Sequence, residues 1–425
     1  MKWPIVPLHK VAYLESGFGF PRDFQGDPNQ EFPFFRVSDM NLEGNEVFMF
    51  NYTNTVSSAT LSKLGARGFP EGTVIFPKIG AAIATEKKRI LTKSATYDNN
   101  VMGAVPKECV HARFLYYWFL RLKLTEQANP GHVPSIRKSV MEQIPFELPT
   151  VSEQHRIVKI LDEADRLRRL RREADAKATR ILPALFLKMF GDPATNPRGW
   201  PLHEIREFVK PVSRRNPMLK PEQSFQYLDI SGVDGGQGVV LESKQILGKQ
   251  APSRARQEIK WHDVVVSTVR PYLRATALVP QFLDGQIAST GFCVLRSCPG
   301  FGFGWLYALT RQIWFTEKLN IRARGASYPA VTDSDIFSLI IPLPNDESLL
   351  REFDIWITDI EILREQTSGA SNNIESLFNL LLEHAFSGQL TAKWREAHSK
   401  ELLAEMEQQA RLLNLPLPKE LELGL

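Results

Sequence analysis

The sequence repeats its own layout once, and this internal repeat limits the possible folds more than any other feature. The period is roughly 190 to 197 residues, far longer than the unit of a solenoid. The segment Pro7–His9 returns as Pro201–His203, and the apolar run Val74–Phe76 returns as Val264–Val266. A chain of 425 residues can bury two separate hydrophobic cores. We therefore expect two related domains, each formed by one repeat.

Each repeat ends in a proline-rich segment that leads into a long helical pattern. These segments are Gln143–Pro149 and Leu339–Pro344. Because proline biases the preceding residue away from the helical region, both segments predict a boundary. The first helix is predicted to start near Thr150, since Thr150 and Glu153 have the spacing of a capping box. Pro183 lies inside the first pattern and predicts a kink or an end there.

Apolar residues recur at heptad spacing in both helical patterns. In the first helix one set of positions holds Ile157, Ala164, Arg171, Ala178 and Leu185, and a second set holds Ile160, Leu167, Ala174 and Ile181. In the second helix the corresponding sets are Phe353, Ile360, Thr367, Ile374 and Leu381, and then Trp356, Leu363, Ala370 and Leu377. Two matched stripes of about four heptads favour packing of the two helices against each other. In the alternative, each stripe packs onto its own domain.

The composition fits a folded protein of a reducing cytoplasm. Apolar residues make up 43% and charged residues 24%, as in ordinary globular domains. A net charge of +4 is only weak support for nucleic-acid binding. The three cysteines, Cys109, Cys293 and Cys298, have the spacing of neither a disulfide framework nor a zinc site. Neither an export signal nor a run of about 18 apolar residues is found, so we expect a cytoplasmic protein without a membrane span.

Motifs of the common nucleic-acid enzymes are missing from the sequence. A phosphate-binding loop needs Gly-Lys-Ser/Thr, but Gly248 and Lys249 are followed by Gln250. The Asn/Asp-Pro-Pro-Tyr/Phe motif of amino-methyltransferases has no better counterpart than Asn129–Gly131 and Asn196–Arg198. Clustered carboxylates for a nuclease metal and a helical histidine pair for zinc are also missing. The sequence therefore predicts a non-catalytic protein without a metal site.

Three short motifs follow one another in each repeat. In the first repeat they are a Gly-x-x-Pro loop at Gly131–Pro134, an Ile-Pro-x-x-Leu-Pro exit at Ile144–Pro149 and a Glu-Gln-x-x-Ile helix start at Glu153–Ile157. The second repeat lacks the Glu-Gln pair and has Gly325 with Pro329, Ile341–Pro344 and Glu352–Phe353. With a strand-rich domain before each set, this layout resembles the specificity subunit of type I restriction-modification enzymes, over about residues 4 to 390.

The resemblance implies an α/β (α+β) fold with two target-recognition domains, related by pseudo-twofold symmetry and joined by two long antiparallel coiled-coil helices. The expected segments are a first recognition domain (1–148), a first spacer helix (149–193), a second recognition domain (194–343), a second spacer helix (344–390) and a C-terminal helical tail (391–425). The tail is expected to dock either on a partner or on its own protein.

The resemblance also implies partners and a role in phage defence. Each recognition domain is expected to read one half of an asymmetric, bipartite target in double-stranded DNA, with half-sites about one helical turn apart. Two methyltransferase subunits, which methylate DNA, and optionally two restriction subunits are expected to dock on the helices. The docking residues would be Ile157, Leu167, Ile181, Trp356, Leu363 and Leu377. S-adenosylmethionine, ATP and Mg belong to those partners, so this chain is expected to hold no cofactor.

Candidate DNA contacts lie in predicted loops that combine hydrogen-bond donors, positive charge and aromatic faces. In the first repeat they are Phe18, Arg22, Arg36, Ser38, Lys78, His132, Ser135 and Arg137. In the second repeat they are Arg270, Tyr272, Arg274, Arg324, Ser327 and Tyr328. The alternative for each is an ordinary solvated loop residue. The basic run Lys87–Arg89 also suggests phosphate binding, whereas acids between the arginines of Arg166–Arg172 favour an exposed, salt-linked helix face.

Three alternatives to a DNA-reading subunit stay open. An assembly scaffold would bridge partners without sequence preference and with little salt dependence. The same recognition role could serve a phage-defence system built around a different effector. An enzyme with an unrecognised site would show turnover by the isolated chain, and the missing motifs argue against it.

Overall fold

The computed structural model describes residues 3–416, apart from the side chains of Thr179, Glu365 and Ser368. Residues 1–2 of the predicted first domain and 417–425 of the predicted tail lie outside the described residues. Within the described part of the chain, every helix is too short or too polar to cross a membrane.

The chain divides into two compact units. Unit 1 comprises residues 1–169 and 372–425, and unit 2 comprises residues 170–371. Two helices of 40 residues each, α5 (Val151–Phe190) and α9 (Glu347–Phe386), contribute one part to each unit. Each unit therefore contains one strand-rich domain together with a segment of both long helices.

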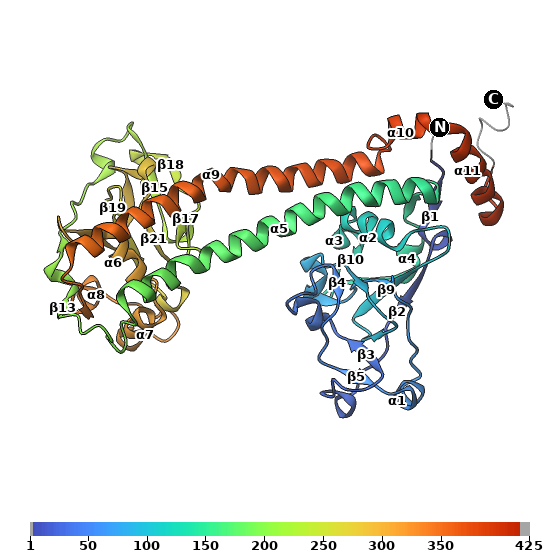
Figure 1. Ribbon diagram of the computed structural model, residues 1–425, viewed down its shortest axis with the longest axis horizontal. Coiled ribbons are helices and arrows are strands. Elements are labelled where there is room, and N and C mark those ends of the chain that lie inside the picture. Colours follow the sequence, from blue (N-terminus) through green and yellow to red (C-terminus); the bar gives the residue numbers. More distant parts are fainter. Residues whose placement is uncertain (1–2, 417–425) are drawn as a thin grey trace. The chain divides into compact units, whose positions relative to one another are not determined.

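Unit 1 is built on a five-stranded sheet in the order β2-β9-β6-β7-β4. A three-stranded sheet, β5-β3-β8, lies on the side away from α5, and the pairs β1-β12 and β10-β11 complete the strands (Figure 1). The strands are β1 (Ile5–Pro7), β2 (Ala12–Ser16), β3 (Phe32–Phe35), β4 (Phe48–Met49), β5 (Thr55–Val56), β6 (Val74–Pro77), β7 (Arg89–Leu91), β8 (Thr96–Tyr97), β9 (Val101–Pro106), β10 (Ala128–Asn129), β11 (Ser135–Ile136) and β12 (Pro145–Glu147). The helices are α1 (Ser58–Lys63), α2 (Ala112–Arg121), α3 (Leu124–Gln127), α4 (Lys138–Glu142), α10 (Ala392–Ala397) and α11 (Ser399–Leu413), with parts of α5 and α9.

Unit 2 repeats this plan. Its four-stranded sheet β14-β23-β20-β21 has the same order as β2-β9-β6-β7, and a second sheet has the order β18-β15-β22-β19. The second sheets also correspond, since β3 pairs parallel with β8 and β15 pairs parallel with β22. The strands are β13 (Leu202–Glu204), β14 (Val209–Lys210), β15 (Ser224–Leu228), β16 (Val233–Asp234), β17 (Val239–Val240), β18 (Lys244–Leu247), β19 (Ala255–Glu258), β20 (Val264–Ser267), β21 (Thr276–Leu278), β22 (Ile287–Ser289), β23 (Phe292–Ser297) and β24 (Ile340–Pro342). The helices are α6 (Phe303–Thr310), α7 (Ile313–Arg322) and α8 (Asp333–Phe337), with the remaining parts of α5 and α9.

The central strand of each unit is buried on both faces. In β6, Val74 and Phe76 join the core on the helix side of the sheet, and Ile75 joins a separate core on the other face. The alternation in β20 is the same, with Val265 on the face opposite the helices. Successive side chains of a strand point to opposite faces. An uninterrupted apolar run is therefore needed where both faces are covered.

A layer of short helices separates each sheet from the long helices. In unit 1, α2 to α4 lie between the main sheet and α5 (Figure 1). The aromatic residues of α2 are buried in one core with Ile157 and Leu161 of α5 and Phe378 and Leu382 of α9. In unit 2, α6 shares a core with α5 and α9 in the same way. The long helices thus pack both on each other and on the domains. Both packing arrangements considered from the sequence therefore occur.

The predicted helix seam is half correct. Ile157 and Phe353 of the first heptad set are buried, and the other members of that set are half-buried. The second set is not the packed one, because Leu167, Ile181 and most of its other members are exposed. The residues one position further along are buried or half-buried instead: Leu161, Arg168, Asp175 and Leu182 on α5, and Ile357, Arg364, Ser371 and Phe378 on α9. The buried face is shifted because each helix also covers its own domain.

Polar groups lie inside the seam of both units. In unit 2, the Arg171 guanidinium pairs with Asp175, and its Nε lies 2.9 Å from Ser371 Oγ. Phe186, further along α5, contacts Phe353, which precedes Ser371 on α9, so the two segments run antiparallel within unit 2. In unit 1, Arg168 pairs with Asp165 at 2.7 Å and Glu375 at 3.4 Å, and its guanidinium lies 3.9 Å from the centroid of the Phe378 ring.

The basic run of α5 is salt-linked, as its acids predicted. Arg166 pairs with Glu163, and Arg169 pairs with Asp165. The prediction that Arg168 lies off the seam was wrong, because its long side chain covers Phe378 while its charge meets carboxylates.

The ends of the long helices differ in part from the predictions. Thr150 precedes α5 and its hydroxyl accepts a hydrogen bond from the Glu153 amide (3.3 Å), as in the predicted capping box. The Glu153 carboxylate, however, bonds to other partners. The second helix starts at Glu347, inside the expected segment 344–390, and Asp346 before it accepts from the amides of Ser348 and Leu349. Finally, α5 continues through Pro183 and does not end there.

The C-terminal helices α10 and α11 dock on unit 1 itself. The buried Glu153 carboxylate accepts hydrogen bonds from Trp3 Nε1 (2.8 Å), Thr391 Oγ1 (2.6 Å) and Arg395 Nε (2.8 Å). Gln409 Nε2 donates to the Pro149 carbonyl over 3.3 Å. One carboxylate therefore joins the first described residue, the start of α5 and the tail.

Replacing Glu153 by Ala is expected to release the tail. Loss of the carboxylate leaves the half-buried Arg395 guanidinium without its counter-charge, although it still donates to the Gly388 carbonyl. The expected cost is about 3 kcal/mol, or roughly a hundredfold in the opening equilibrium. Hydrogen exchange should then show faster exchange of the amides of α10 and α11. Glu401→Ala, an exposed change on α11, is the control, and unchanged protection in Glu153→Ala would contradict the prediction.

Asp354 is expected to make the stability of unit 2 depend on pH. Its carboxylate accepts from the Gly304 amide over 2.7 Å, and burial raises its pKa from 3.8 to about 6. A carboxyl group whose pKa is higher in the folded state than in the unfolded chain stabilises the fold at pH values below its unfolded-state pKa. This stabilisation is lost as the pH rises through the folded-state pKa. Asp354→Asn keeps an acceptor without the charge. Its melting temperature should exceed that of the wild type by about 2–4 °C at pH 8 and by less at pH 5; an equal difference at both pH values would contradict this.

Candidate nucleic-acid interface

The same pair of loops meets at the end of the central strand in each unit. In unit 1, the turn after β6 contacts the predicted Gly-x-x-Pro loop: the Gly80 amide donates to the Pro134 carbonyl (2.8 Å), and the Ile136 amide donates to the Lys78 carbonyl (2.9 Å). Ile79 and Ser135 form a bridge between the two segments. We call residues 78–80 with 131–135 loop pair 1.

Unit 2 makes the equivalent three contacts. The Arg270 amide donates to the Pro329 carbonyl (2.7 Å), and the Val331 amide donates to the Thr268 carbonyl (2.8 Å). Val269 and Ala330 form the bridge. We call residues 268–274 with 324–330 loop pair 2. The two loop pairs thus have one backbone arrangement and different side chains.

Loop pair 1 carries one half-buried cation and several exposed groups. Lys78 Nζ donates to Ser16 Oγ over 2.8 Å, and burial lowers the pKa of Lys78, opposed by the nearby Asp98 carboxylate. His132 and Arg137 are exposed, and Ser135 is half-buried. These side chains can offer donors and charge to a ligand that approaches the loop pair.

The segment beside Lys78 approaches the sheet closely. A Cβ atom at Gly17 would lie 2.0 Å from the Asp98 carbonyl oxygen, so glycine is required there. The next residue, Phe18, is half-buried and stacks on Phe69 with ring centroids 6.0 Å apart. Because its ring takes part in the packing of the domain, we leave Phe18 out of the interface proposed below.

Hydrogen bonds of Arg36 link a second group of loops in unit 1. Its guanidinium donates to Gln25 Oε1 (3.1 Å) and Thr53 Oγ1 (3.4 Å), and its amide donates to the Asp39 carboxylate. The predicted contacts Arg22 and Ser38 are exposed on these loops. Arg36 also acts on the Asp98 carboxylate electrostatically, as a charge that lowers its pKa against the dominant effect of burial.

Loop pair 2 exposes more aromatic surface. The rings of Tyr272 and Tyr328 are exposed, and the Arg270 guanidinium lies 4.4 Å from the centroid of Tyr328. Arg274 is tied down by a hydrogen bond to the Arg311 carbonyl. Arg324 pairs with Asp335 at 3.4 Å, and Ser327 is exposed.

Some features of these loops escaped the sequence analysis. Val133 and Leu273 are exposed apolar residues on the loop pairs, and their apolar character suggested burial instead. If the alignment of Val74–Phe76 with Val264–Val266 is extended along the chain, Gly80 aligns with Arg270. This alignment was the sequence signal that could have identified the two equivalent turns. The structure also explains the glycine-rich segment near residue 236, which wraps around the Arg311 guanidinium; Arg311 donates to the Gly236 carbonyl over 2.7 Å.

The predicted docking residues divide between surface and core. Leu167, Ile181, Trp356, Leu363 and Leu377 have 48–57% of their surface exposed. Ile157 is fully buried in unit 1, so its predicted docking role was wrong: it packs between the domain and α9.

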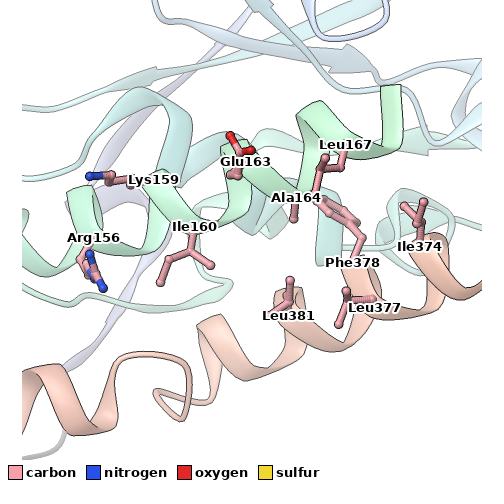
Figure 2. A pocket seen from close by; sticks show the side chains of 10 residues that line it. All are labelled: Arg156, Lys159, Ile160, Glu163, Ala164, Leu167, Ile374, Leu377, Phe378 and Leu381. Carbon is pink, nitrogen blue, oxygen red and sulfur yellow. The ribbon is translucent and has the colours of Figure 1, made fainter. Parts of the chain in front are cut away.

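A groove of about 400 Å³ lies between α5 and α9 in unit 1 (Figure 2). Apolar side chains from both helices face into it, and Arg156, Lys159 and Glu163 lie along the α5 side. The lining residues are Arg156, Lys159, Ile160, Glu163, Ala164, Leu167, Ile374, Leu377, Phe378 and Leu381. This groove includes two of the exposed predicted docking residues.

Known proteins resemble this chain in sequence and in fold. The type I restriction modification DNA specificity domain matches residues 1–179. The type I restriction enzyme EcoDI specificity subunit of Escherichia coli is 24% identical over 344 residues, which cover 72% of this chain and 76% of that protein. The crystal structure of the HsdS subunit from Thermoanaerobacter tengcongensis has 40% sequence identity over 43% of this chain and 48% of its own, with a TM-score of 0.35.

A further solved structure supports the fold. The S subunit of a type I restriction-modification system from M. genitalium matches 90% of this chain and 96% of its own, with a TM-score of 0.51 and 13% identity. This likeness extends the mixed α/β architecture over nearly the whole chain. The chain is therefore similar to type I restriction-modification specificity subunits: the domain match covers residues 1–179, and the likeness to the Escherichia coli subunit extends over 344 residues.

Proposed function

We propose that this chain reads the DNA target of a type I restriction-modification complex. Two recognition domains, residues 1–148 and 194–343, would each bind one half of a bipartite site in double-stranded DNA. The observation that carries the proposal is the repeated loop pair, with equivalent backbone contacts in both units. Equal scaffolds with different side chains present different donors to the bases, so the two half-sites should differ in sequence.

The proposed contacts fall into two kinds. Exposed cations such as Arg22 and Arg137 would neutralise phosphates and supply most of the affinity. Side chains on the loop pairs would supply the contacts to base edges. The proposed DNA-contact residues are Arg22, Arg36, Ser38, Lys78, His132, Ser135, Arg137, Arg270, Tyr272, Arg274, Arg324, Ser327 and Tyr328.

The long helices would set the distance between the half-sites. We propose that the spacer segments 149–193 and 344–390 form an antiparallel coiled coil, with the two recognition domains related by pseudo-twofold symmetry. The antiparallel contacts of Arg171 with Ser371 and of Phe186 with Phe353 in unit 2 support this arrangement. Half-sites about one helical turn apart would follow.

The outward faces of the long helices would bind the other subunits. Contiguous exposed apolar surface often marks a site that a partner covers. Exposed apolar residues of the long helices are Leu167 and Leu377 in unit 1, and Ile181, Trp356 and Leu363 in unit 2. One such face in each unit would bind one methyltransferase subunit, which gives two methyltransferase subunits in all. These subunits would bring S-adenosylmethionine. Restriction subunits with ATP and Mg would join through them, in the cytoplasm, as a defence against phage. The described part of the tail, residues 391–416, would stay on unit 1.

Selection from random duplex DNA tests the reading role. The chain, co-expressed with its methyltransferase subunit, should enrich an asymmetric motif with two specific parts and a fixed gap. Its affinity should fall about a thousandfold between 50 and 200 mM salt if six or more phosphates are contacted. An assembled, soluble complex that enriches no motif would overturn the proposal and leave an assembly scaffold as the better description.

Charge placed on the helix faces tests the docking role. Leu167→Asp with Leu377→Asp should remove one methyltransferase subunit from the purified complex, because a carboxylate would have to be buried without a partner. Trp356→Asp with Leu363→Asp should remove the other. Leu412→Asp, at an 80% exposed position on α11, is the matched control. Unchanged mass of the double variants by native mass spectrometry would argue against these faces.

A further inference from the structure

The turn after β20 holds two arginines in a strained conformation. Arg270 and Arg274 have φ angles of 50° and 55°, and they flank the short turn Pro271–Leu273. This left-handed region costs an ordinary L-residue roughly 1 kcal/mol relative to glycine. Such strain is maintained only where the side chain has a use or the surroundings impose it.

The surroundings do not demand a side chain at position 270. Gly80 occupies the same place in loop pair 1, with φ 74° and the equivalent hydrogen bond to a proline carbonyl. A Cβ atom at Gly80 would meet no other heavy atom within 4 Å. The turn therefore accepts glycine, and in unit 2 the arginine side chain takes its place at a conformational cost.

Arg270 holds its guanidinium beside an aromatic plane and without an acceptor. The guanidinium lies 4.4 Å from the centroid of Tyr328, whose side chain is 68% exposed. Among the described residues none accepts a hydrogen bond from the Arg270 guanidinium, and its buried Nε has no partner. Arg274 and Arg324 differ, since each has an oxygen acceptor within the protein.

We propose that Arg270, stacked on Tyr328, reads a guanine in the half-site bound by unit 2. This inference rests on the proposed function and adds the base that is read. The planar guanidinium matches the two acceptors of guanine in the major groove, O6 and N7. Stacking on Tyr328 fixes the plane of the fork before DNA arrives. Unit 1 has no side chain at the matching Gly80, so its half-site is not read from this position.

A phosphate contact is the competing use of the same cation. It would raise affinity for every sequence alike, because phosphates carry no sequence information. A strained backbone and a stacked, planar fork add nothing to a contact that an exposed lysine makes equally well. The geometry therefore favours a base contact.

The test repeats the selection from random duplex DNA with Arg270→Gly and Arg270→Lys in the full complex. Arg270→Gly should lose the preference for guanine at one position of one half-site and bind the wild-type target tenfold or more weakly. Its melting temperature should be no lower than that of the wild type, because glycine relieves the φ strain. Arg270→Lys should also lose the preference, since an ammonium cannot donate bidentately in the same plane. Leu219→Ala, an exposed change in unit 2 away from the loop pair, is the control.

The outcomes separate this inference from the proposed function. A wild-type motif that Arg270→Gly leaves unchanged overturns the guanine reading alone. Weaker binding of all sequences by Arg270→Gly, with full rescue by Arg270→Lys, also overturns it and assigns a phosphate contact. A wild-type complex that enriches no motif overturns the proposed function and the inference together.

Discussion

Burial of each domain's helix layer against the two long helices holds the structure together. In unit 1, Phe114 and Tyr117 of α2 contact Phe386 and Phe378 of α9, and Asp162 of α5 accepts from Tyr117 Oη over 2.6 Å. Aromatic side chains bury roughly 150–250 Å² each, so these contacts are a large part of the core. The same core covers the central strand, and the loop pair follows directly from the end of that strand. The position of the proposed DNA contacts therefore depends on the packing of the long helices.

Much of this architecture could be predicted from the repeat and the heptads. The apolar central strands and the long helix that follows each proline-rich exit lie where the sequence placed them. The exact face of the helices could not be predicted, because the packed positions include Arg168 and Asp175, whose polarity suggests solvent. Arg168 and Asp175 each form ion pairs within the seam. A pattern of apolar residues cannot predict such ion pairs. The capping residue of α9, Asp346, was not identified from the sequence, because it is not in the Thr-x-x-Glu form of the first helix.

The candidate site was harder to predict than the fold. The composition of the loops identified cations and aromatic residues. It did not show which of these side chains pack or form hydrogen bonds within the protein itself. Phe18 packs on Phe69, and Arg36 is held by Gln25 and Thr53. The Arg270 guanidinium, in contrast, has no hydrogen-bond acceptor among the described residues. The distinction depends on neighbours that are distant in sequence, and so it becomes visible only once the two loops of each pair are seen together.

The division of the chain has a consequence for how the protein is made. Unit 2 is one continuous segment, whereas unit 1 needs residues after 371, such as Phe378 and Leu382 of α9 and Thr391, to cover the apolar face of its part of α5 and to satisfy Glu153. At 5–20 residues per second, synthesis of the intervening segment takes roughly ten to forty seconds. During that time the domain that leaves the ribosome first is incomplete, and the second can fold before it. A truncation that removes the residues after 371 therefore damages the first recognition domain more than the second.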